Sequence, residues 1–539
     1  METEPKEELQ VDAPDVLPSD SEHDKEAMLP GTLHMERIRL CMTRLDHWLL
    51  FGGMFLAAYV FNLDYCTRST FVSYAAASYL EHSLLATINV VRGVIAASVQ
   101  PIAAKLADLI GRLEVFIVGA GFYILGTVIQ AGGHTMTSLA VGALLQQIGY
   151  ATEILIMEIV VADIISLRSR TPFLFLPNAP YLINAWVGGN ITASLMGDGA
   201  DKWRWGIGMY GIVYPVATVP FTGMLWWLGR RADRKASEDG GPARISYLTG
   251  HQSITSIVVD LFWKLDLLGL FFLTASLAML LIPTTLAGGE SSKWKSAGIL
   301  APVILGFLLA FVFIYIESRV PHPVMPFRLL KERNVWATLG VGIFTCLVWA
   351  TQGNYLYTVL VVSYDFSIAS ATRIASLYSF CEILGGFIVG VLVYYVRRVK
   401  WLVVAGVAIN FVGLGVMLHY RGGYETSSKI GVIAGQVLVG YAVSWYGFPI
   451  AIAAQSMTKH GDIAVLTSLW LTCNYIGMAF GESVAGAIWT QVLYSQLDKD
   501  LSPIDPTLAP SVYASPLYVV PTYAFVLDGA DLCVYIVSA

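Results

Sequence analysis

Charged residues are scarce in this sequence, and the signature of an ATP-driven motor is absent. Asp, Glu, Lys and Arg make up 13 % of the 539 residues, whereas soluble domains carry about 25 %. So few charges cannot coat the water-facing surface of a soluble protein of this size. The sequence also contains no Gly-Lys pair, so it lacks the Gly-x-x-x-x-Gly-Lys-Ser/Thr loop that cradles ATP phosphates. These absences argue against a soluble domain and an ATP-driven pump.

Cysteine is scarce too, and the six cysteines form no recognisable site. They are scattered, without a Cys-x-x-Cys pair or a His and Cys cluster, so neither a disulfide framework nor a metal site is predicted. The Gly-x-Ser-x-Gly and His-Glu-x-x-His patterns of hydrolases do not stand out either. We therefore expect no enzyme activity, no cofactor and no nucleic-acid partner.

Long apolar blocks are what the sequence does contain. Hydrophobic residues make up 56 % of the chain, and the mean hydropathy is +0.62. A block of about 20 apolar residues crosses the ~30 Å hydrocarbon core of a bilayer as a helix, because backbone groups in lipid must be paired within the segment. We predict an all-α, polytopic membrane protein with thirteen spans. The spans cover residues 47–66, 82–105, 114–131, 138–162, 171–195, 206–228, 262–283, 296–317, 337–362, 371–396, 400–419, 429–457 and 462–492.

Positive charge is uneven between the two sets of loops. The loops after even-numbered spans hold clusters such as Arg230, Arg231 and Arg234, whereas most loops after odd-numbered spans hold fewer. Lys- and Arg-rich loops stay in the cytosol, so these loops and the N-terminus are predicted to be cytosolic. Residues 1–30 hold ten acidic residues against two Lys, and we expect residues 1–46 to form a disordered acidic cytosolic tail.

The longest polar break, residues 229–261, is expected to be a cytosolic linker. It separates six spans from the rest, as in transporters built from two helical halves. The last apolar stretch contains Asp528 and Asp531, each of which would cost ~2.5–3.5 kcal/mol at mid-membrane. We therefore expect the last helix to be missing, as in a truncated or mis-spliced product. The other expected parts are an N-terminal six-helix half at 47–228, two extra transmembrane helices at 262–317, five helices of a C-terminal half at 337–492 and an extracellular or aberrant tail at 493–539.

The loop after the second span carries a motif. Residues 104–112 read Ala-Lys-Leu-Ala-Asp-Leu-Ile-Gly-Arg, which resembles the loop motif of the major facilitator superfamily, whose core is Leu-Ala-Asp-x-x-Gly-Arg. The resemblance implies that Asp108 and Arg112 belong to a charge network that closes the cytosolic side. An ordinary charged turn is the alternative.

A narrower resemblance runs from residue 47 to residue 515. Taken in order, blocks along the chain look like the fungal siderophore-iron transporters of that superfamily. The resemblance implies a major facilitator fold with two six-helix halves and two extra helices between them. The blocks that carry it are residues 62–71 (NLDYCTRSTF), 82–87 (HSLLAT), 162–168 (ADIISLR), 184–190 (NAWVGGN), 355–362 (YLYTVLVV) and 371–380 (ATRIASLYSF).

The function that the resemblance implies is secondary active import of ferric siderophores, of the hydroxamate type, by proton symport. The expected partners are an Fe(III)-siderophore, protons and the lipid bilayer, and a monomer is expected. The plasma membrane is favoured, with an endosomal or vesicular membrane as the alternative.

Other functions on the same scaffold stay open. A multidrug/proton antiporter would carry a Gly-Pro-x-x-Gly-Gly element in the fifth span. Here Gly188 and Gly189 are present, but Pro177 and Pro180 lie well upstream, which weighs against antiport. A glutathione exchanger is poorly separated from a siderophore importer by sequence. A non-transporting receptor usually gains a long soluble tail, which this chain lacks.

Ionisable residues inside the spans are candidates for coupling. Glu158 is the preferred proton carrier, Glu153 shares its span, and Glu382 is the candidate in the second half, with Arg92 as a possible cationic counterpart. A structural hydrogen bond by the protonated carboxyl group is the alternative for each glutamate.

Two further sets of residues could contact the substrate. Asp64 and Arg68 lie four residues apart near the end of the first span, so they share a helix face and form either an outer gate or an interfacial ion pair. A bulky, largely neutral ferric siderophore needs aromatic and amide groups rather than metal ligands. The candidates for its pocket, each of which could instead serve helix packing, are Trp186, Asn184, Asn190, Gln352, Tyr355, Tyr357, Arg373 and Tyr378.

Overall fold

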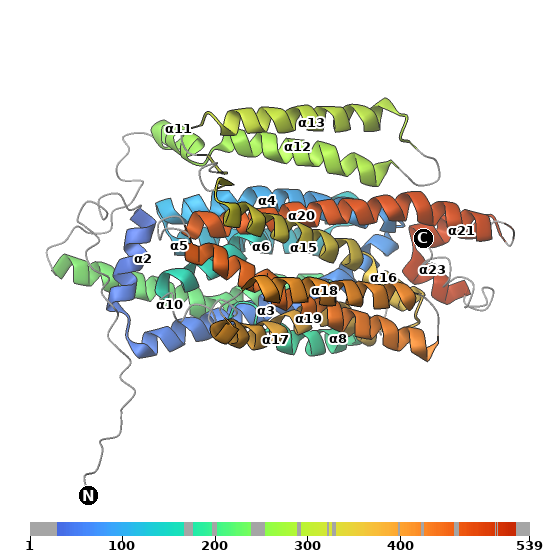
Figure 1. The fold of residues 1–539 in the computed structure, drawn as a ribbon, viewed down its shortest axis with the longest axis horizontal. Helices are drawn as coiled ribbons and strands as arrows, with labels where there is room; N and C mark the ends of the chain where they lie inside the picture. The colour runs from blue at the N-terminus through green and yellow to red at the C-terminus, as the bar shows by residue number, and fades with distance from the viewer. Residues whose placement is uncertain are drawn as a thin grey trace, which may run out of the picture.

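The structure, a computed structural model, is built of helices. It describes residues 30–165, 176–196, 202–238, 254–287, 293–320, 323–325, 330–396, 399–421, 425–457, 463–501, 503 and 505–523. No strand occurs within these ranges. Figure 1 shows the long helices running side by side along one direction. The predicted all-α architecture is confirmed.

Two groups of helices form the two halves of the bundle. The first half contains α3 (Arg44–Ser78), α4 (Leu85–Ile110), α5 (Arg112–Gly132), α6 (Met136–Ile164), α8 (Tyr181–Met196), the short α9 (Trp203–Gly208) and α10 (Tyr210–Glu238). The second half contains α15 (Arg333–Gly353), α16 (Leu356–Val362), α17 (Ile368–Val396), α18 (Val399–His419), α19 (Thr426–Met457) and α20 (Ile463–Ile488). We name the ends of the bundle after Arg112, at the start of α5, and Tyr355, just before α16.

Most of these helices are suited to a bilayer. Within the described residues, eleven helices are long and apolar enough to cross a membrane. The 16 residues of α8 and the 26 residues of α20 add two more helices to the bundle. Each of the predicted spans overlaps one helix of this set.

The halves meet along two helix pairs, α4 with α20 and α8 with α17. Small residues allow α4 and α20 to approach closely, as is common between membrane helices. A Cβ atom added at Gly93 would lie 3.0 Å from the Cβ of Ala479, and one added at Gly486 would lie 2.6 Å from the Cβ of Ala86. The seam between the halves is therefore tightly packed.

Two extra helices lie on one side of this seam. They are α12 (Leu267–Leu286) and α13 (Ala297–Glu317), preceded by the short α11 (Ile254–Lys264). Figure 1 shows the pair stacked outside α4 and α20, with α13 farthest out. Because α12 packs against both α4 and α20, it contacts both halves at once.

The first span is longer than its sequence predicts. It was expected to end at residue 66, but α3 continues to Ser78. The hydropathy pattern breaks at Asp64 and Arg68, whose charges neutralise each other one helical turn apart. A paired charge no longer requires water, so the helix continues, and the pair lies deep inside the bundle.

The described part of the N-terminal interval 1–46 contains a helix, where a disordered tail was expected. Residues 30–41 form the helix α2 (Pro30–Cys41), whose Met35 and Ile38 are buried. Figure 1 shows α2 lying across the Arg112 end of the long helices. These two apolar side chains, one turn apart on one face, dock the helix there.

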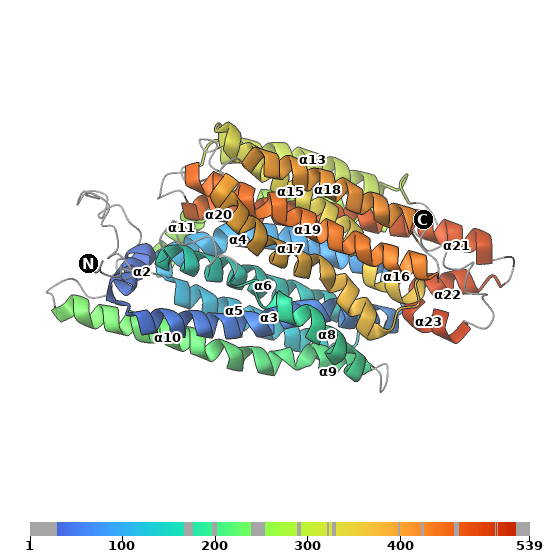
Figure 2. The same cartoon turned by 60° about the horizontal axis from the view of Figure 1, so that its bottom comes forward.

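The chain after α20 also folds onto the bundle. A π-helical turn (Trp489–Leu493) leads into α21 (Tyr494–Leu501), followed by α22 (Leu508–Ala514) and α23 (Pro516–Tyr523). Figure 2 shows these helices at the end opposite α2. The Ser515 hydroxyl donates to the Ala77 carbonyl at 2.8 Å, so this segment contacts α3. Asp528 and Asp531 lie outside the described residues.

Replacing Gly486 by Leu should destabilise the protein, because even a Cβ there would clash with Ala86 and with Thr285 of α12. Overpacking of this kind costs about 1–3 kcal/mol. We expect a lower melting temperature for the purified Gly486→Leu variant. Gly121→Leu is the matched control, since a Cβ at Gly121 meets nothing within 4 Å. Equal melting temperatures for the two variants would contradict the tight seam.

Candidate functional site

A charge network occupies the Arg112 end. The Arg112 guanidinium lies 2.8 Å from Asp108 Oδ1 and 2.9 Å from Asp163 Oδ2, and it also donates to the Ala107 carbonyl at 2.8 Å. Gly111 allows the tight turn between α4 and α5, because its φ of 124° lies in a region that residues with a side chain rarely adopt. The network therefore ties the ends of α4, α5 and α6 together.

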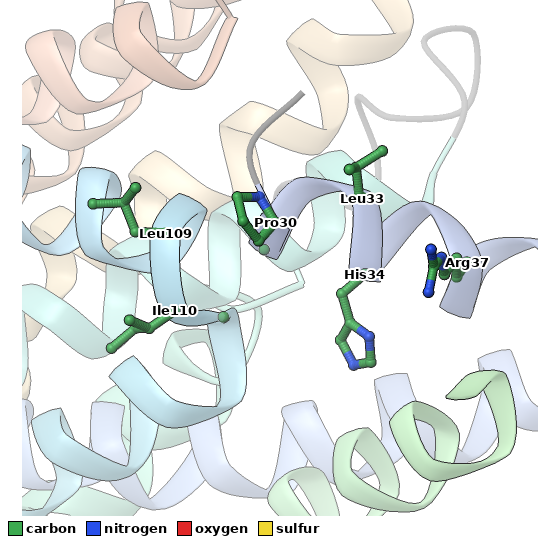
Figure 3. A pocket seen from close by; sticks show the side chains of 8 residues that line it. Pro30, Leu33, His34, Arg37, Leu109 and Ile110 are labelled. Carbon is green, nitrogen blue, oxygen red and sulfur yellow. The ribbon is translucent and has the colours of Figure 1, made fainter. Parts of the chain in front are cut away.

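Helix α2 is seated on this network. The Thr32 hydroxyl donates to Asp108 Oδ1 at 3.1 Å and accepts from Arg112 at 3.4 Å. His34 Nδ1 lies 3.4 Å from Asp233 Oδ1 of α10. Figure 3 shows the small pocket between α2 and the end of α4, which Leu33 and Ile110 help to line. This pocket lies at the Arg112 end and not between the two halves.

Asp64 and Arg68 form a buried pair inside the first half. The Arg68 guanidinium lies 2.8 Å from Asp64 Oδ2 and donates to the Thr127 hydroxyl of α5 at 3.1 Å. The Tyr123 hydroxyl donates to the same carboxylate. Both charged side chains are almost fully buried, and their side-chain hydrogen-bond partners among the described residues belong to α3 and α5. The pair thus fastens two helices of one half to each other.

Glu153 belongs to the same buried region. Its carboxyl group accepts a hydrogen bond from the Tyr214 hydroxyl of α10. The Tyr214 ring lies 4.5 Å, centre to centre, from the ring of Tyr123, which contacts Asp64. Glu153 is therefore enclosed by α5, α6 and α10, on the side of α6 that faces its own half.

Other ionisable residues gather between the halves, in what we call the central cluster. Arg92 of α4 interacts electrostatically with Tyr65 and Tyr150 from the first half and with Glu482 of α20. Tyr475 of α20 interacts with Arg92 and with Glu158 of α6. The cluster consists of Tyr65, Arg92, Tyr150, Glu158, Tyr378, Glu382, Tyr475 and Glu482.

The glutamates of the central cluster differ in their surroundings. Glu158 and Glu382 are partly buried, and neither makes a hydrogen bond with a described residue. Glu382 interacts with Tyr378 and Tyr446 from its own half. Glu482 is only 5 % exposed, and its Oε2 has no hydrogen-bond partner within the described part of the chain.

Arg92 is held by amide side chains. Its Nε donates to Gln147 Oε1 of α6 at 3.1 Å, and its Nη1 donates to Asn89 Oδ1 at 3.2 Å. The Asn89 amide in turn donates to Asn354 Oδ1 at 3.0 Å, which lies in the second half. One hydrogen-bonded chain therefore links the central arginine to both halves.

The halves are joined by several polar contacts at the Tyr355 end. The Thr372 hydroxyl of α17 lies 3.0 Å from that of Thr70 in α3 and 3.1 Å from that of Thr192 in α8. Arg373, one residue on, donates to Asn190. These contacts close the seam between α3, α8 and α17 at this end.

A second seam at the same end is closed by hydrogen bonds that join Ser83 and His82 to residues of the second half. The rings of Tyr355 and Trp489 stack 3.9 Å apart, and the Tyr355 hydroxyl donates to the Ser83 carbonyl at 3.3 Å. His82 Nε2 lies 3.0 Å from the Thr358 hydroxyl. The turn just before α4 is thus fastened to the second half in this conformation.

The remaining pocket candidates fall in different surroundings. Asn184 is buried and donates to the Tyr59 carbonyl at 2.8 Å. Trp186 is 50 % exposed and packs edge-on against Phe380 of α17. Gln352 accepts from Gln436 of α19 at 2.7 Å. These residues do not form one pocket in this conformation.

Two other candidates are buried aromatic residues. Tyr357 packs against Tyr74 of α3, with ring centres 6.3 Å apart. Tyr378 lies in the central cluster, with its ring 6.2 Å from that of Trp349.

Sequence reasoning missed several residues of these networks. Asp163, which shares Arg112 with Asp108, was not assigned to the cytosolic network, and Glu482 was not singled out although it is a carboxyl group inside a predicted span. The cost of a charge in lipid could have flagged Glu482. The proximity of Glu482 to Arg92 of α4 could not be foreseen, because the two residues lie far apart in the sequence.

The chain is similar to curated fungal proteins along most of its length. It is 37 % identical over 479 residues to "Siderophore iron transporter 1" of Saccharomyces cerevisiae. The matched region covers 88 % of this chain and 75 % of that protein. It is 30 % identical over 465 residues to "Siderophore iron transporter 1" of Schizosaccharomyces pombe, covering 85 % and 72 %. No family model matches the chain.

Solved transporters share its fold. A crystal structure of the peptide transporter POT has a TM-score of 0.55 at 15 % identity, covering 89 % of this chain and 95 % of that one. A bacterial homologue of the human lysosomal transporter Spinster has a TM-score of 0.53 at 15 % identity, covering 92 % of each chain. At such low identity the likeness shows the fold alone.

Breaking the Asp64–Arg68 pair should destabilise the first half. Replacing one partner leaves an uncompensated buried charge, which costs about 3–5 kcal/mol. We expect Arg68→Met alone to lower the melting temperature of the purified protein strongly. In Asp64→Leu combined with Arg68→Met no buried charge is left, so the double variant should regain much of that loss. A double variant less stable than Arg68→Met would contradict the compensation of charge between these two side chains.

Proposed function

The chain belongs to the siderophore iron transporters of the major facilitator superfamily, and from this premise we propose that it is a secondary active transporter that imports ferric siderophores. Its relatives are transporters, and it is a multi-pass membrane protein rather than an enzyme. The identity of 37 % to a siderophore iron transporter over 88 % of the chain carries the proposal.

The substrate that we propose is a hydroxamate siderophore with its Fe(III) already bound. The chelator fills the coordination shell of the iron, so the protein contacts the chelator and not the metal. Such a ligand offers apolar surface together with carbonyl and hydroxamate oxygen atoms. Tyrosine rings and the amide and guanidinium donors around Arg92 suit this mixture. The pocket candidates remain Trp186, Asn184, Asn190, Gln352, Tyr355, Tyr357, Arg373 and Tyr378.

The route of the substrate follows the seam between the halves. With the Arg112 end in the cytosol, as the loop charges predict, the contacts at the Tyr355 end close the outer side in this conformation. Import then requires these contacts to break and re-form while the Asp108–Arg112 network acts as the cytosolic gate. Asp64 and Arg68 support the outer side by fastening α3 to α5.

Proton symport is the driving mechanism that we propose. Glu158 and Glu382 lie on opposite halves and face the central cluster, and neither makes a hydrogen bond with a described residue. A carboxyl group in this position can bind a proton on one side of the membrane and release it on the other. Glu153 is the weaker candidate, because Tyr214 already occupies its carboxyl group.

The chain should act as a monomer, since its substrate path lies within one copy. We place it in the plasma membrane, where an imported siderophore first meets the cell; an endosomal or vesicular membrane is the alternative. Fluorescence microscopy of the tagged full chain distinguishes these two locations.

The decisive test is growth rescue of an iron-starved fungal strain that lacks its own siderophore carriers. We expect rescue by at least one ferric trihydroxamate and uptake of its radioactive iron that stops when a protonophore collapses the proton gradient. Rescue by no siderophore, with the protein present at the membrane, would contradict the proposed substrate. Acquired drug resistance or glutathione exchange in that strain would instead support the two alternative carriers.

The proposed proton carriers can be tested in the same cells. Gln mimics the protonated carboxyl group but cannot release a proton, so Glu158→Gln and Glu382→Gln should abolish accumulation of the siderophore against its gradient. Exchange of internal for external siderophore should survive, because it moves no net proton. Glu332→Gln, at an exposed carboxylate before α15, is the control. Unchanged accumulation in both variants would exclude these residues as the carriers.

A further inference from the structure

Glu482 is the buried carboxyl group of the central cluster that shares its surroundings with a cation. It lies on α20, and Arg92 lies on α4, the helix that packs against α20 most closely across the seam. Arg92 interacts electrostatically with Glu482. Among the described residues no cation acts in this way on Glu158 or Glu382.

The two side chains are close enough to interact but not in direct contact. No salt bridge joins them in this conformation, in which Arg92 donates to Gln147 and Asn89. Glu482 Oε2 is buried without a hydrogen-bond partner in the described part of the chain. An ionised carboxylate left in this way is costly. Glu482 can avoid that cost by binding a proton or by drawing the Arg92 guanidinium toward itself.

The other described groups around Glu482 offer no further way to compensate its charge. Among the described residues, Tyr65 of α3 and Tyr355 also interact electrostatically with Glu482. Helix α12 contains no charged residue, and the charged residue of α15, Arg333, lies at the far end of that helix. The charge of Glu482 is therefore balanced by Arg92 or by a proton.

The Arg92 guanidinium can donate hydrogen bonds to the Glu482 carboxylate or to a ligand, but not to both equally well. Its guanidinium carries five N–H donors, and the hydrogen bonds to Gln147 and Asn89 engage Nε and Nη1. Hydroxamate oxygen atoms are electron-rich acceptors, and a guanidinium binds such atoms strongly. An ionised Glu482 would compete with them for the same cation.

We propose that Glu482 is a further proton-binding group, beside Glu158 and Glu382, and that it controls substrate affinity through Arg92. This inference rests on the proposed function and deepens it. A proton from the outer solution neutralises the Glu482 carboxylate, and Arg92 is then available to the oxygen atoms of the siderophore. When the proton leaves to the cytosol, the carboxylate reclaims Arg92 and the substrate is released.

The competition makes proton and substrate binding reciprocal. If protonation of Glu482 tightens siderophore binding, a bound siderophore must favour protonation by the same factor. Such positive linkage is what symport requires. The hydrogen bond from Asn89 to Asn354 adds a mechanical link, because movement of Arg92 toward Glu482 removes a partner from Asn89 at the contact between the halves.

Direct binding to the purified full-length protein tests the inference. The probe is a ferric trihydroxamate labelled with radioactive iron, and affinity is measured from acidic to alkaline pH. For the wild type we expect affinity to fall as pH rises, by up to about tenfold per pH unit, the limit for one linked proton. Glu482→Gln should bind as tightly as the acidic wild type at every pH, because its amide does not compete for Arg92 as a carboxylate does.

A second variant guards against a loss of folding in the first. Arg92→Gln should bind weakly at every pH, because the shared cation is gone, and its pH dependence should vanish too. Glu81→Gln is the control. It replaces an exposed carboxylate near the Tyr355 end and should keep the wild-type dependence of affinity on pH. Melting temperature and gel filtration identify any variant that does not fold.

The outcomes separate this inference from the function on which it rests. A wild type that binds the probe, with the wild-type pH profile retained in Glu482→Gln or in Arg92→Gln, would overturn the role of the pair and leave siderophore transport intact. A folded wild type that binds no ferric siderophore at any pH would overturn the proposed function itself.

Discussion

A charge buried among apolar helices needs a partner, because an ion removed from water carries a penalty of several kcal/mol. The first half of the bundle meets this constraint internally. Asp64 and Arg68 satisfy each other between α3 and α5, and Arg112 is neutralised by two aspartates at the ends of α4 and α6. Because these charges have their partners within the first half, helices α3 to α6 can move together. The central cluster is the exception, since its ionisable groups come from both halves.

The seam between the halves combines close helix packing with individually weak polar and aromatic contacts. Glycine and alanine bring α4 and α20 together without large interlocking side chains, so the helices can shift against each other. The contacts that close the Tyr355 end are hydroxyl, amide and aromatic contacts and one guanidinium–amide hydrogen bond, each individually modest. Helix α12 packs on both α4 and α20, so the extra helices must follow any movement of the seam. This arrangement suits alternating access by rocking of two halves.

Much of this architecture could be predicted from the sequence. Apolar blocks located the helices because lipid permits few other structures, and the four-residue spacing of Asp64 and Arg68 indicated a shared helix face. The end of α3 was misplaced because hydropathy counts a charge as a stop even when a neighbour neutralises it. The proximity of Arg92 to Glu482 could not be predicted, since it depends on how α4 and α20 meet. The docking of α2 was missed because its two buried apolar side chains, Met35 and Ile38, give a weak apolar pattern.

The central claim is that substrate enters through the Tyr355 end as the two halves separate there. Thr70 and Thr372 face each other across this seam with their hydroxyl oxygens 3.0 Å apart, so cysteines at both positions can form a disulfide. The direct measurement is siderophore uptake by Thr70→Cys combined with Thr372→Cys, in a background with the six native cysteines replaced. Uptake should cease on oxidation and return on reduction. Undiminished uptake by the fully cross-linked protein would contradict the account.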